Sequence, residues 1–436
     1  MTFLRSFALI LIWALPAQAE MNIQSVTSKG GITAWLVQDT EIPFTALEIQ
    51  FRGGTSLDAP GKRGAVNLMT ALIEEGAGDL DAQGFAAARD AMAASFSFRA
   101  YDDSISVSAK FLTEVHDPAT DLLHLALTEP RFDADAVERV RGQVLAGLRA
   151  DAKDPDTLAS DTFNKLAFGD HPYGSSGDGT IETVTALSRD DILDAHKGAL
   201  ARDRIYIAAA GDISPDELGA LLDRLFDGLP ATGAALPGRV EWTLSKGVTV
   251  VDFPTPQSVV MFGHGGLKRD DPDFFAAFIL NEVLGGGRFS ARLMTEVREK
   301  RGLTYGIGTG LAPRDHSEMW LGQFSSDNDK VAEAIKVVQD QWQLTATEGI
   351  SAQELEDAKT YMTGSYPLRF DSNAAIANIL VGMQMEDLPI DYAVTRNAKV
   401  EAVTLEDVKR VAARLLSTDA LHFVVVGQPE GLPSAP

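Results

Sequence analysis

An internal duplication requires that any fold of this chain be built from two similar halves. The segment "LSRDDILDAHKGALARDRIYIAAAGD" matches "VTLEDVKRVAARLLSTDALHFVVVGQ" further along the chain. Ser188 and Thr404 lie 216 positions apart, as do Gly211 and Gly427, so the two copies share one register without a gap. In each copy, Ser or Thr followed by acidic residues predicts a helix start, and a run of β-formers predicts a strand after that helix.

The halves also begin alike, and a segment with the composition of a linker separates them. The stretches "SKGGITAWLV" and "SKGVTVVDF" each precede a further strand, a Gly-Gly pair and a helix, and "GLPATGAALPGRVEW" between the copies is rich in Pro, Gly and Ala. We therefore predict an α+β fold of two duplicated domains, each a β-sheet covered by helices on one face. The predicted boundaries are 20–228 and 243–430 for the domains, 229–242 for the linker and 431–436 for a tail.

The first residues of the chain have the layout of a secretory signal. A lone Arg5 precedes an apolar run at 7–15, and the small residues Ala17 and Ala19 follow it. The run is shorter than the roughly eighteen residues of a membrane span. We predict a cleaved signal peptide at 1–19, a periplasmic or secreted protein, and no stable membrane insertion; a retained N-terminal anchor is the alternative.

The composition excludes several classes of function. The chain has 62 acidic and 38 basic residues and a net charge of −24, a field that repels nucleic-acid phosphates and attracts basic peptides. Alternatively, this charge serves only solubility. There are no cysteines, which excludes disulfides and every cysteine-based nucleophile or metal site.

Three longer segments carry a resemblance to a known family. They are "FGDHPYGSSGDGTIETVTALSRDDILDAH", "AAAGDISPDELGALLDRLFDGLP" and, most specifically, "LGGGRFSARLMTEVREKRGLTYGI". With them the chain resembles the M16 metallopeptidases, the family of insulinase, pitrilysin and the mitochondrial processing peptidase. In that family two duplicated domains form one half of a clamshell, and two such halves enclose an unfolded peptide, so the resemblance implies an M16 half-clamshell here.

The zinc motif of that family is degenerate in this chain. Active members bind zinc through an inverted His-x-x-Glu-His helix and a later Glu. The matching stretch "RGAVNLMTALIEEGA" has Asn67, Thr70 and Ala71 at the positions of His, Glu and His. The helix of the third ligand matches "QVLAGLRADAKDPD", which offers Ala146 and Gly147. The resemblance therefore implies that this chain holds no metal and no cofactor, and is not active alone.

Other residues provide no replacement for the lost ligands. Glu74 and Glu75 read as the polar end of a helix rather than an acid–base pair, and His171, in "HPYG", reads as a loop element. No two histidines stand three or four positions apart, the spacing that places two ligands on one helical face. The seven histidines are His116, His124, His171, His196, His264, His316 and His422.

Arg298 and Tyr305 match a pair that the second domain supplies in active family members. A guanidinium and a phenol are suitable donors to the oxygen that gains negative charge during peptide hydrolysis. The pattern places Arg298 in the last turn of a helix, predicts a left-handed cap at Gly302, and puts Leu303, Tyr305 and Ile307 on one strand face. Alternatively, Arg298 complements the helix dipole and Tyr305 is a half-buried strand residue.

These features lead to one functional hypothesis and one rival. The hypothesis is a non-catalytic subunit that lends Arg298, Tyr305 and half of the chamber to a zinc-bearing M16 homologue, in a heterodimer that cleaves peptides. The rival is a catalytically dead peptide-binding or scaffold protein, monomeric or homodimeric, that acts without such a partner. The resemblance also suggests Gly285, Gly286 and Gly287 as a substrate-binding loop, although three glycines can simply end a helix.

Overall fold

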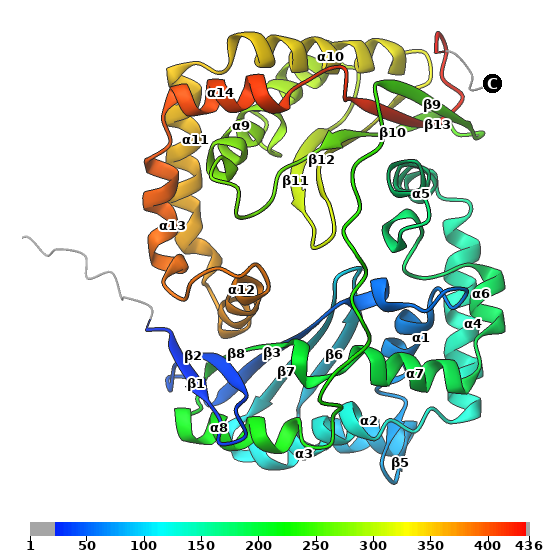
Figure 1. Cartoon of the computed structure of the whole chain (residues 1–436), viewed down its shortest axis with the longest axis vertical. Helices are drawn as coiled ribbons and strands as arrows, with labels where there is room; N and C mark the ends of the chain where they lie inside the picture. The colour runs from blue at the N-terminus through cyan, green and yellow to red at the C-terminus, as the bar shows by residue number, and fades with distance from the viewer. Residues whose placement is uncertain (1–21, 433–436) are drawn as a thin grey trace, which may run out of the picture.

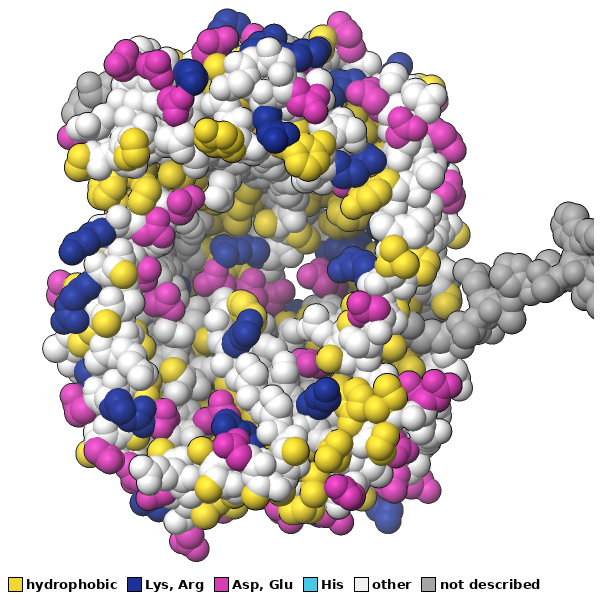
Figure 2. All heavy atoms as spheres, turned by 180° about the vertical axis from the view of Figure 1, so that it is seen from behind, with side chains coloured by type: hydrophobic (Ala, Val, Ile, Leu, Met, Phe, Trp, Pro, Cys, Tyr) yellow, Lys and Arg dark blue, Asp and Glu magenta, His cyan; other side chains and the backbone are white. Residues whose placement is uncertain are grey.

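The computed structural model describes residues 22–432, which form two α+β halves facing each other across a central opening (Figure 1). The space-filling view retains this opening and shows charged side chains of both signs around it (Figure 2). The architecture confirms the predicted α+β class. The predicted signal peptide at 1–19 lies outside the described residues. Within the described part of the chain, no helix has the length and apolar character of a membrane span.

The first half is built around a six-stranded sheet. Its elements are β1 (Gln24–Thr27), β2 (Thr33–Gln38), β3 (Phe44–Arg52), α1 (Ala65–Leu72), β4 (Gly76–Ala77), β5 (Leu80–Asp81), α2 (Ala82–Ala91), β6 (Ser95–Ala100), β7 (Ser104–Leu112), α3 (His116–Thr128), α4 (Ala134–Asp151), α5 (Pro155–Phe168), α6 (Ile181–Ala186), α7 (Arg189–Ala199), β8 (Ile205–Gly211) and α8 (Pro215–Leu225). The strand order is β1-β2-β8-β3-β7-β6, with β2 and β8 parallel and the other neighbours antiparallel. Helices of this half cover the outer face of the sheet (Figure 1).

The second half is built around a five-stranded sheet. Its elements are β9 (Gly247–Asp252), β10 (Gln257–Gly265), α9 (Phe274–Gly285), β11 (Ile307–Pro313), β12 (Glu318–Asp327), α10 (Val331–Glu348), α11 (Ala352–Ser365), α12 (Asn373–Met385), α13 (Tyr392–Glu401), α14 (Leu405–Leu415) and β13 (His422–Gly427). The strand order is β11-β12-β10-β13-β9, with β13 and β9 parallel. Its own helices again cover the outer face.

The duplicated sequence forms equivalent elements in the two halves. Ser188 caps α7 and Thr404 caps α14, each with a capping box, and each helix leads to the strand that pairs in parallel within its sheet. Gly211 and Gly427 both end their strand with a positive φ, of 128° and 157°. The predicted helix starts at Ser188 and Thr404 are therefore confirmed.

The inner face of the first sheet receives a helix from the second half. α12 packs on β3 and β8, where Ala46, Ala208 and Ala210 meet Leu380 and Val381. Alanines on the strands let the helix approach closely, and all five side chains are buried. The prediction of helices on one face of each sheet therefore holds for the outer face, which helices of the same half cover. In addition, α12 of the second half covers the inner face of the first sheet.

The second sheet receives a helix from the first half in return. Ala159 and Phe163 of α5 pack against Val259, Val424 and Val426 on the inner face of β10 and β13. Phe163 is fully buried there. Each half therefore completes its core with a helix from the other.

The segment between the halves has neither helix nor strand from Ala231 to Lys246, but it is packed in place. The Trp242 ring lies 5.5 Å from that of Phe163 and 6.1 Å from that of Phe168. The Val240 amide donates to the carbonyl of His316 at 2.9 Å. The segment with linker composition is therefore a structured connection.

Glu48 supplies a prediction about the pH dependence of stability. It lies on β3, on the same face as Ala46, and burial raises its pKa to about 7 despite a hydrogen bond from Ser108 at 2.7 Å. When the pKa of a carboxyl is higher in the folded state than in the unfolded state, the free energy of unfolding falls as the pH rises from the unfolded-state pKa through the folded-state pKa. We expect Glu48→Gln to gain about 2 kcal/mol of unfolding free energy relative to the parent protein between pH 5 and pH 8.

Urea unfolding at the two pH values measures this difference. Glu41→Gln is the matched control, because Glu41 is exposed and should give the same small change at both pH values. An equal effect of Glu48→Gln at pH 5 and pH 8 would contradict the prediction.

Candidate functional site

Arg298 lies near the end of a π-helix at Met294–Glu299. The wide turn is seen in the hydrogen bond from the Lys300 amide to the carbonyl of Thr295, five residues back, at 3.0 Å. Single π-turns inside helices occur frequently at functional sites. The Arg298 guanidinium lies 4.7 Å from the centre of the Phe289 ring, and its side chain has no hydrogen bond or ion pair within residues 22–432. The sequence predicted an ordinary α-helix at this position, whereas the structure has a π-helix.

Tyr305 lies in a bend just before strand β11, so its predicted position on a strand face was wrong. Leu303 and Ile307 are buried, whereas Tyr305 is 85% exposed. Thr304 stabilises this bend, because its hydroxyl accepts from the Gly306 amide at 3.2 Å and donates to the carbonyl of Ser325 at 2.7 Å. The phenol of Tyr305 therefore points into solvent, away from the core.

Arg298 and Tyr305 line the same cavity, which has a volume of about 310 Å³. Gly302 lies between them with φ 62°, so the predicted left-handed cap is confirmed. At the rim, the Lys330 ammonium pairs with the carboxylate of Asp327 at 2.6 Å. The guanidinium and the phenol form no hydrogen bond or ion pair within residues 22–432, so both are available as donors to a bound group.

The three glycines form the end of α9 and the turn after it. A Cβ on Gly285 would lie 2.3 Å from the Oγ1 of Thr309, so only glycine lets this helix end so close to β11. Gly287 has φ 75°, which also favours glycine. Together with Gly286 they border a cavity of about 700 Å³ beside β11. This geometry explains the glycines structurally, and their role in substrate binding stays a prediction.

The positions that match the zinc motif lie on α1 and α4 and do not fit a metal. The Thr70 hydroxyl is buried and donates to the carbonyl of Val66 at 2.8 Å. Asn67 offers one amide, Ala71 an exposed methyl group, and Gly147 no side chain at all. Zinc requires three or four converging nitrogen, sulfur or carboxylate ligands. Within residues 22–432, no three His, Cys, Asp or Glu side chains are grouped so that they could hold a metal ion.

The acidic pair after α1 is engaged in ion pairs. Glu74 accepts from Arg89 at 2.7 Å, and Glu75 accepts from Arg139 at 3.1 Å. Burial raises the pKa of Glu74, and the hydrogen bond from Arg89 opposes this shift. The two carboxylates bind separate arginines, as expected for the polar end of a helix.

The histidines are placed as structural side chains. Hydrogen bonds to backbone carbonyls hold the imidazoles of His124, His171, His196, His264 and His422. Burial is the main cause that lowers the pKa of His171, His196 and His264. Burial therefore favours the neutral form of these three rings.

A polar cluster that the sequence did not predict joins the two halves. Asp103 accepts a hydrogen bond from the hydroxyl of Tyr173 at 2.6 Å, and that hydroxyl in turn accepts from the His316 amide at 3.1 Å. Arg314 lies 4.5 Å from the centre of the Tyr173 ring and binds the carboxylate of Asp102. Burial raises the pKa of Tyr173. The cluster fixes the β11–β12 hairpin to the first half, and its only sequence signal was the "HPYG" loop.

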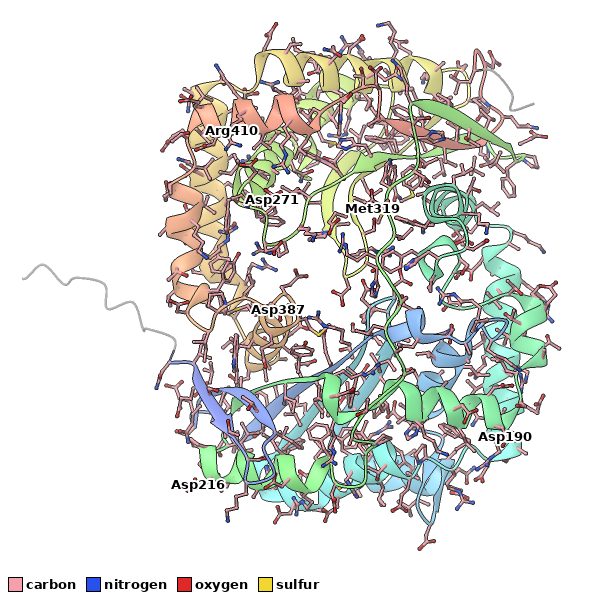
Figure 3. All side chains as sticks on the ribbon, in the orientation of Figure 1. Asp190, Asp216, Asp271, Met319, Asp387 and Arg410 are labelled. Atoms are coloured by element: carbon pink, nitrogen blue, oxygen red, sulfur yellow. The ribbon has the colours of Figure 1, made fainter. Side chains whose placement is uncertain are left out.

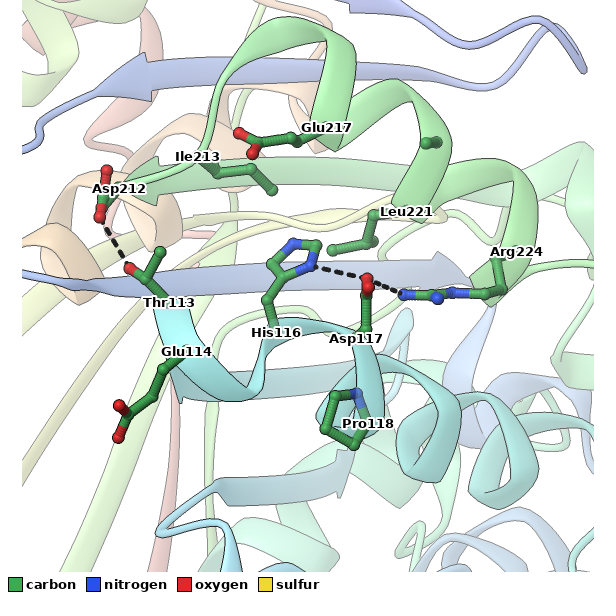
Figure 4. A pocket seen from close by; sticks show the side chains of 11 residues that line it. Thr113, Glu114, His116, Asp117, Pro118, Asp212, Ile213, Glu217, Leu221 and Arg224 are labelled. Carbon is green, nitrogen blue, oxygen red and sulfur yellow. Dashed lines mark hydrogen bonds and ion pairs between the residues drawn. The ribbon is translucent and has the colours of Figure 1, made fainter.

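A further cavity, of about 600 Å³, lies between α3 and α8 of the first half (Figure 4). His116 lies 3.4 Å from Asp117, which accepts from Arg224 at 2.9 Å. Thr113 donates to Asp212 at 2.8 Å. Because these groups bind one another, the cavity presents a paired surface rather than a set of free functional groups.

Comparison with known proteins places the chain and its fold in one family. The family model "Peptidase M16 inactive domain" matches residues 186–362. The crystal structure of a peptidase M16 inactive domain from Pseudomonas fluorescens is similar with a TM-score of 0.87 and 30% sequence identity, covering 95% of this chain and 100% of that one. The chain belongs to the M16 peptidase family.

Two sequence relatives illustrate the range of this family. A non-peptidase homolog, YmxG, from Helicobacter pylori is 27% identical over 88% of this M16 chain and 89% of that protein. An uncharacterized zinc protease from Streptomyces coelicolor is 27% identical over 91% of this chain and 87% of that protein. The predicted resemblance is confirmed. With its degenerate zinc positions and its match to the inactive domain, this chain is an inactive-type M16 member.

Proposed function

We propose that this M16 chain is the non-catalytic subunit of an extracytoplasmic, zinc-dependent peptidase. Its partner in a heterodimer is a zinc-bearing M16 homologue, which holds the metal and cleaves peptides. This chain contributes Arg298, Tyr305 and half of the wall that encloses the substrate.

One observation carries the proposal: Arg298 and Tyr305 line one open cavity, with side chains that form no hydrogen bond or ion pair within residues 22–432, whereas α1 lacks zinc ligands. The attacked carbonyl oxygen gains negative charge during peptide hydrolysis, and a guanidinium and a phenol held nearby stabilise it by donating hydrogen bonds. Tyr305, which is 85% exposed at the edge of this cavity, is accessible to a bound peptide.

Charge and the N-terminal sequence support the substrate class and the location. The net charge of −24 favours association with basic peptides, and the segment at 1–19 has the pattern of a secretory signal. Gly285, Gly286 and Gly287 border a cavity beside β11 and are proposed to contact the peptide backbone there.

Tagged purification of the protein from its native host tests the proposal. We expect a second chain to co-elute in equal amount, to carry His-x-x-Glu-His, and to bring one zinc ion per complex, measured by mass spectrometry and metal analysis. Recovery of the protein alone and without zinc would contradict the proposal and favour the peptide-binding or scaffold alternative.

A further inference from the structure

Three arginines converge on a pocket between the two halves, which has a volume of about 550 Å³. Arg269 precedes α9, Arg369 follows α11, and Arg396 lies on α13; we call this site the arginine pocket. Gln50 of β3 and Ser104 of β7 add a wall from the first half. The pocket therefore exists only where the two halves meet.

Aromatic rings hold two of these guanidinium groups in place. Arg269 donates to the hydroxyl of Tyr392 at 2.6 Å and lies 4.1 Å from the centre of the Phe274 ring. Arg396 lies 4.5 Å from the centre of the Tyr366 ring, and its Nη1 donates to the carbonyl of Met362 at 2.7 Å and to Oδ1 of Asn397 at 2.9 Å. Stacking on a ring engages the face of a guanidinium, so the in-plane N–H donors that these bonds do not use remain available. The pocket is thus equipped to bind a planar, two-oxygen anion.

None of the three arginines forms an ion pair within residues 22–432, although acidic residues outnumber basic ones in this chain. Arg396 is only 6% exposed. Two nearby acids are engaged elsewhere, because Arg52 lies 3.7 Å from Asp315 and 3.8 Å from Asp387, which is labelled at the end of α12 in Figure 3. Glu386 at the exposed rim is the remaining lining carboxylate. The pocket therefore carries excess positive charge.

Part of the lining is apolar, which favours an organic anion over a hydrated inorganic one. It includes Phe278, Ile379, Met383 and Leu388. We propose that the arginine pocket binds the C-terminal carboxylate of a peptide whose last side chain is apolar. Guanidinium groups bind the carboxylate, and the apolar wall takes the side chain.

A binding measurement on the full chain alone tests this assignment. The probe is a fluorescein-labelled peptide ending in leucine, compared with the same peptide carrying a C-terminal amide, by fluorescence anisotropy at fixed ionic strength. We expect the amide to bind about tenfold or more weakly. Only the exposure of this chain to peptides is taken from the proposed function, so failure here, with no partner or turnover involved, leaves the subunit proposal intact.

Arg369→Gln is the decisive variant, because Arg369 is exposed and its side chain has no hydrogen bond or ion pair in the described part of the chain. It should weaken binding of the free-acid peptide about tenfold and leave binding of the amide unchanged. Arg202→Gln removes an exposed arginine of the first half, away from the arginine pocket, and should change neither.

Four results would overturn the assignment. Equal affinity for the free-acid and amide peptides would show that the C-terminal carboxylate is not recognised. Unchanged binding of the free-acid peptide by Arg369→Gln would show that the arginine pocket is not the binding site. Equally strong binding of an amidated peptide with an internal glutamate would place recognition on acidic side chains instead. Displacement of the probe by phosphate but not by acetate at equal concentration would identify a site for inorganic anions.

Discussion

Replacing Tyr305 by phenylalanine is expected to lower the turnover number of the assembled peptidase by about ten- to a thousandfold. The substitution removes one hydroxyl from an 85% exposed side chain, so folding and assembly should be unaffected. In the proposed complex the hydroxyl donates to the oxygen that becomes charged only as the reaction proceeds, and its loss should therefore lower kcat more than it raises KM. Steady-state kinetics of the reconstituted complex measure this effect.

Tyr101→Phe provides the matched control for that experiment. Tyr101 is an exposed tyrosine of the first half, and its hydroxyl has no hydrogen-bond partner in the described residues. The variant should retain full activity. An unchanged rate for Tyr305→Phe would remove Tyr305 from the mechanism. If both donors act on one oxygen, Arg298→Gln combined with Tyr305→Phe should cost less than the sum of the single effects.

Replacing Phe163 by alanine is expected to lower the free energy of unfolding by about 3–5 kcal/mol. Phe163 is fully buried, and it belongs to the first half while packing on the sheet of the second. Truncation leaves a cavity between α5 and the sheet of the second half. Since the strands of that sheet are fixed by their hydrogen bonds, the surroundings cannot collapse to fill this cavity. Urea unfolding followed by circular dichroism measures the loss.

Leu166→Ala on the same helix is the control for Phe163→Ala. Leu166 is 39% exposed and should cost much less, about 1 kcal/mol or below. A similar small loss for both variants would show that α5 contributes little to the second sheet. A large loss for Phe163→Ala alone would establish the exchanged helix as part of that core.

The duplicated organisation could be predicted because each copy carries short sequence motifs that mark the start of a helix and the end of a strand. Ser188 and Thr404 are recognisable as caps within the sequence, and each lies at the same distance from a glycine that ends a strand. The exchange of α5 and α12 could not be predicted in the same way. A helical stripe such as that of Phe163 shows that one face is buried, but it does not specify which sheet buries it.

The candidate site was predictable in part, for similar reasons. The cap at Gly302 follows from a local rule, and the structure has it. Tyr305 does not lie on the predicted strand face because β11 begins only at Ile307. Before it lies the bend that Thr304 stabilises through its hydrogen bonds to Gly306 and Ser325. Arg269 and Arg369 are a hundred positions apart in the sequence, and no periodic pattern connects residues that only the turn after α11 and the loop before α9 bring together.

The reciprocal packing of α5 and α12 has a mechanical consequence. Any hinge motion that parted the two sheets would pull each helix off the partner's strands and expose side chains such as Leu380 and Phe163 to water. Hydrogen bonds strengthen the same junction. The His316 amide of the β11–β12 hairpin donates to the hydroxyl of Tyr173, which donates to Asp103. We expect the two halves of this chain to move as one rigid body, so that in the proposed heterodimer a substrate would be admitted by movement between the subunits.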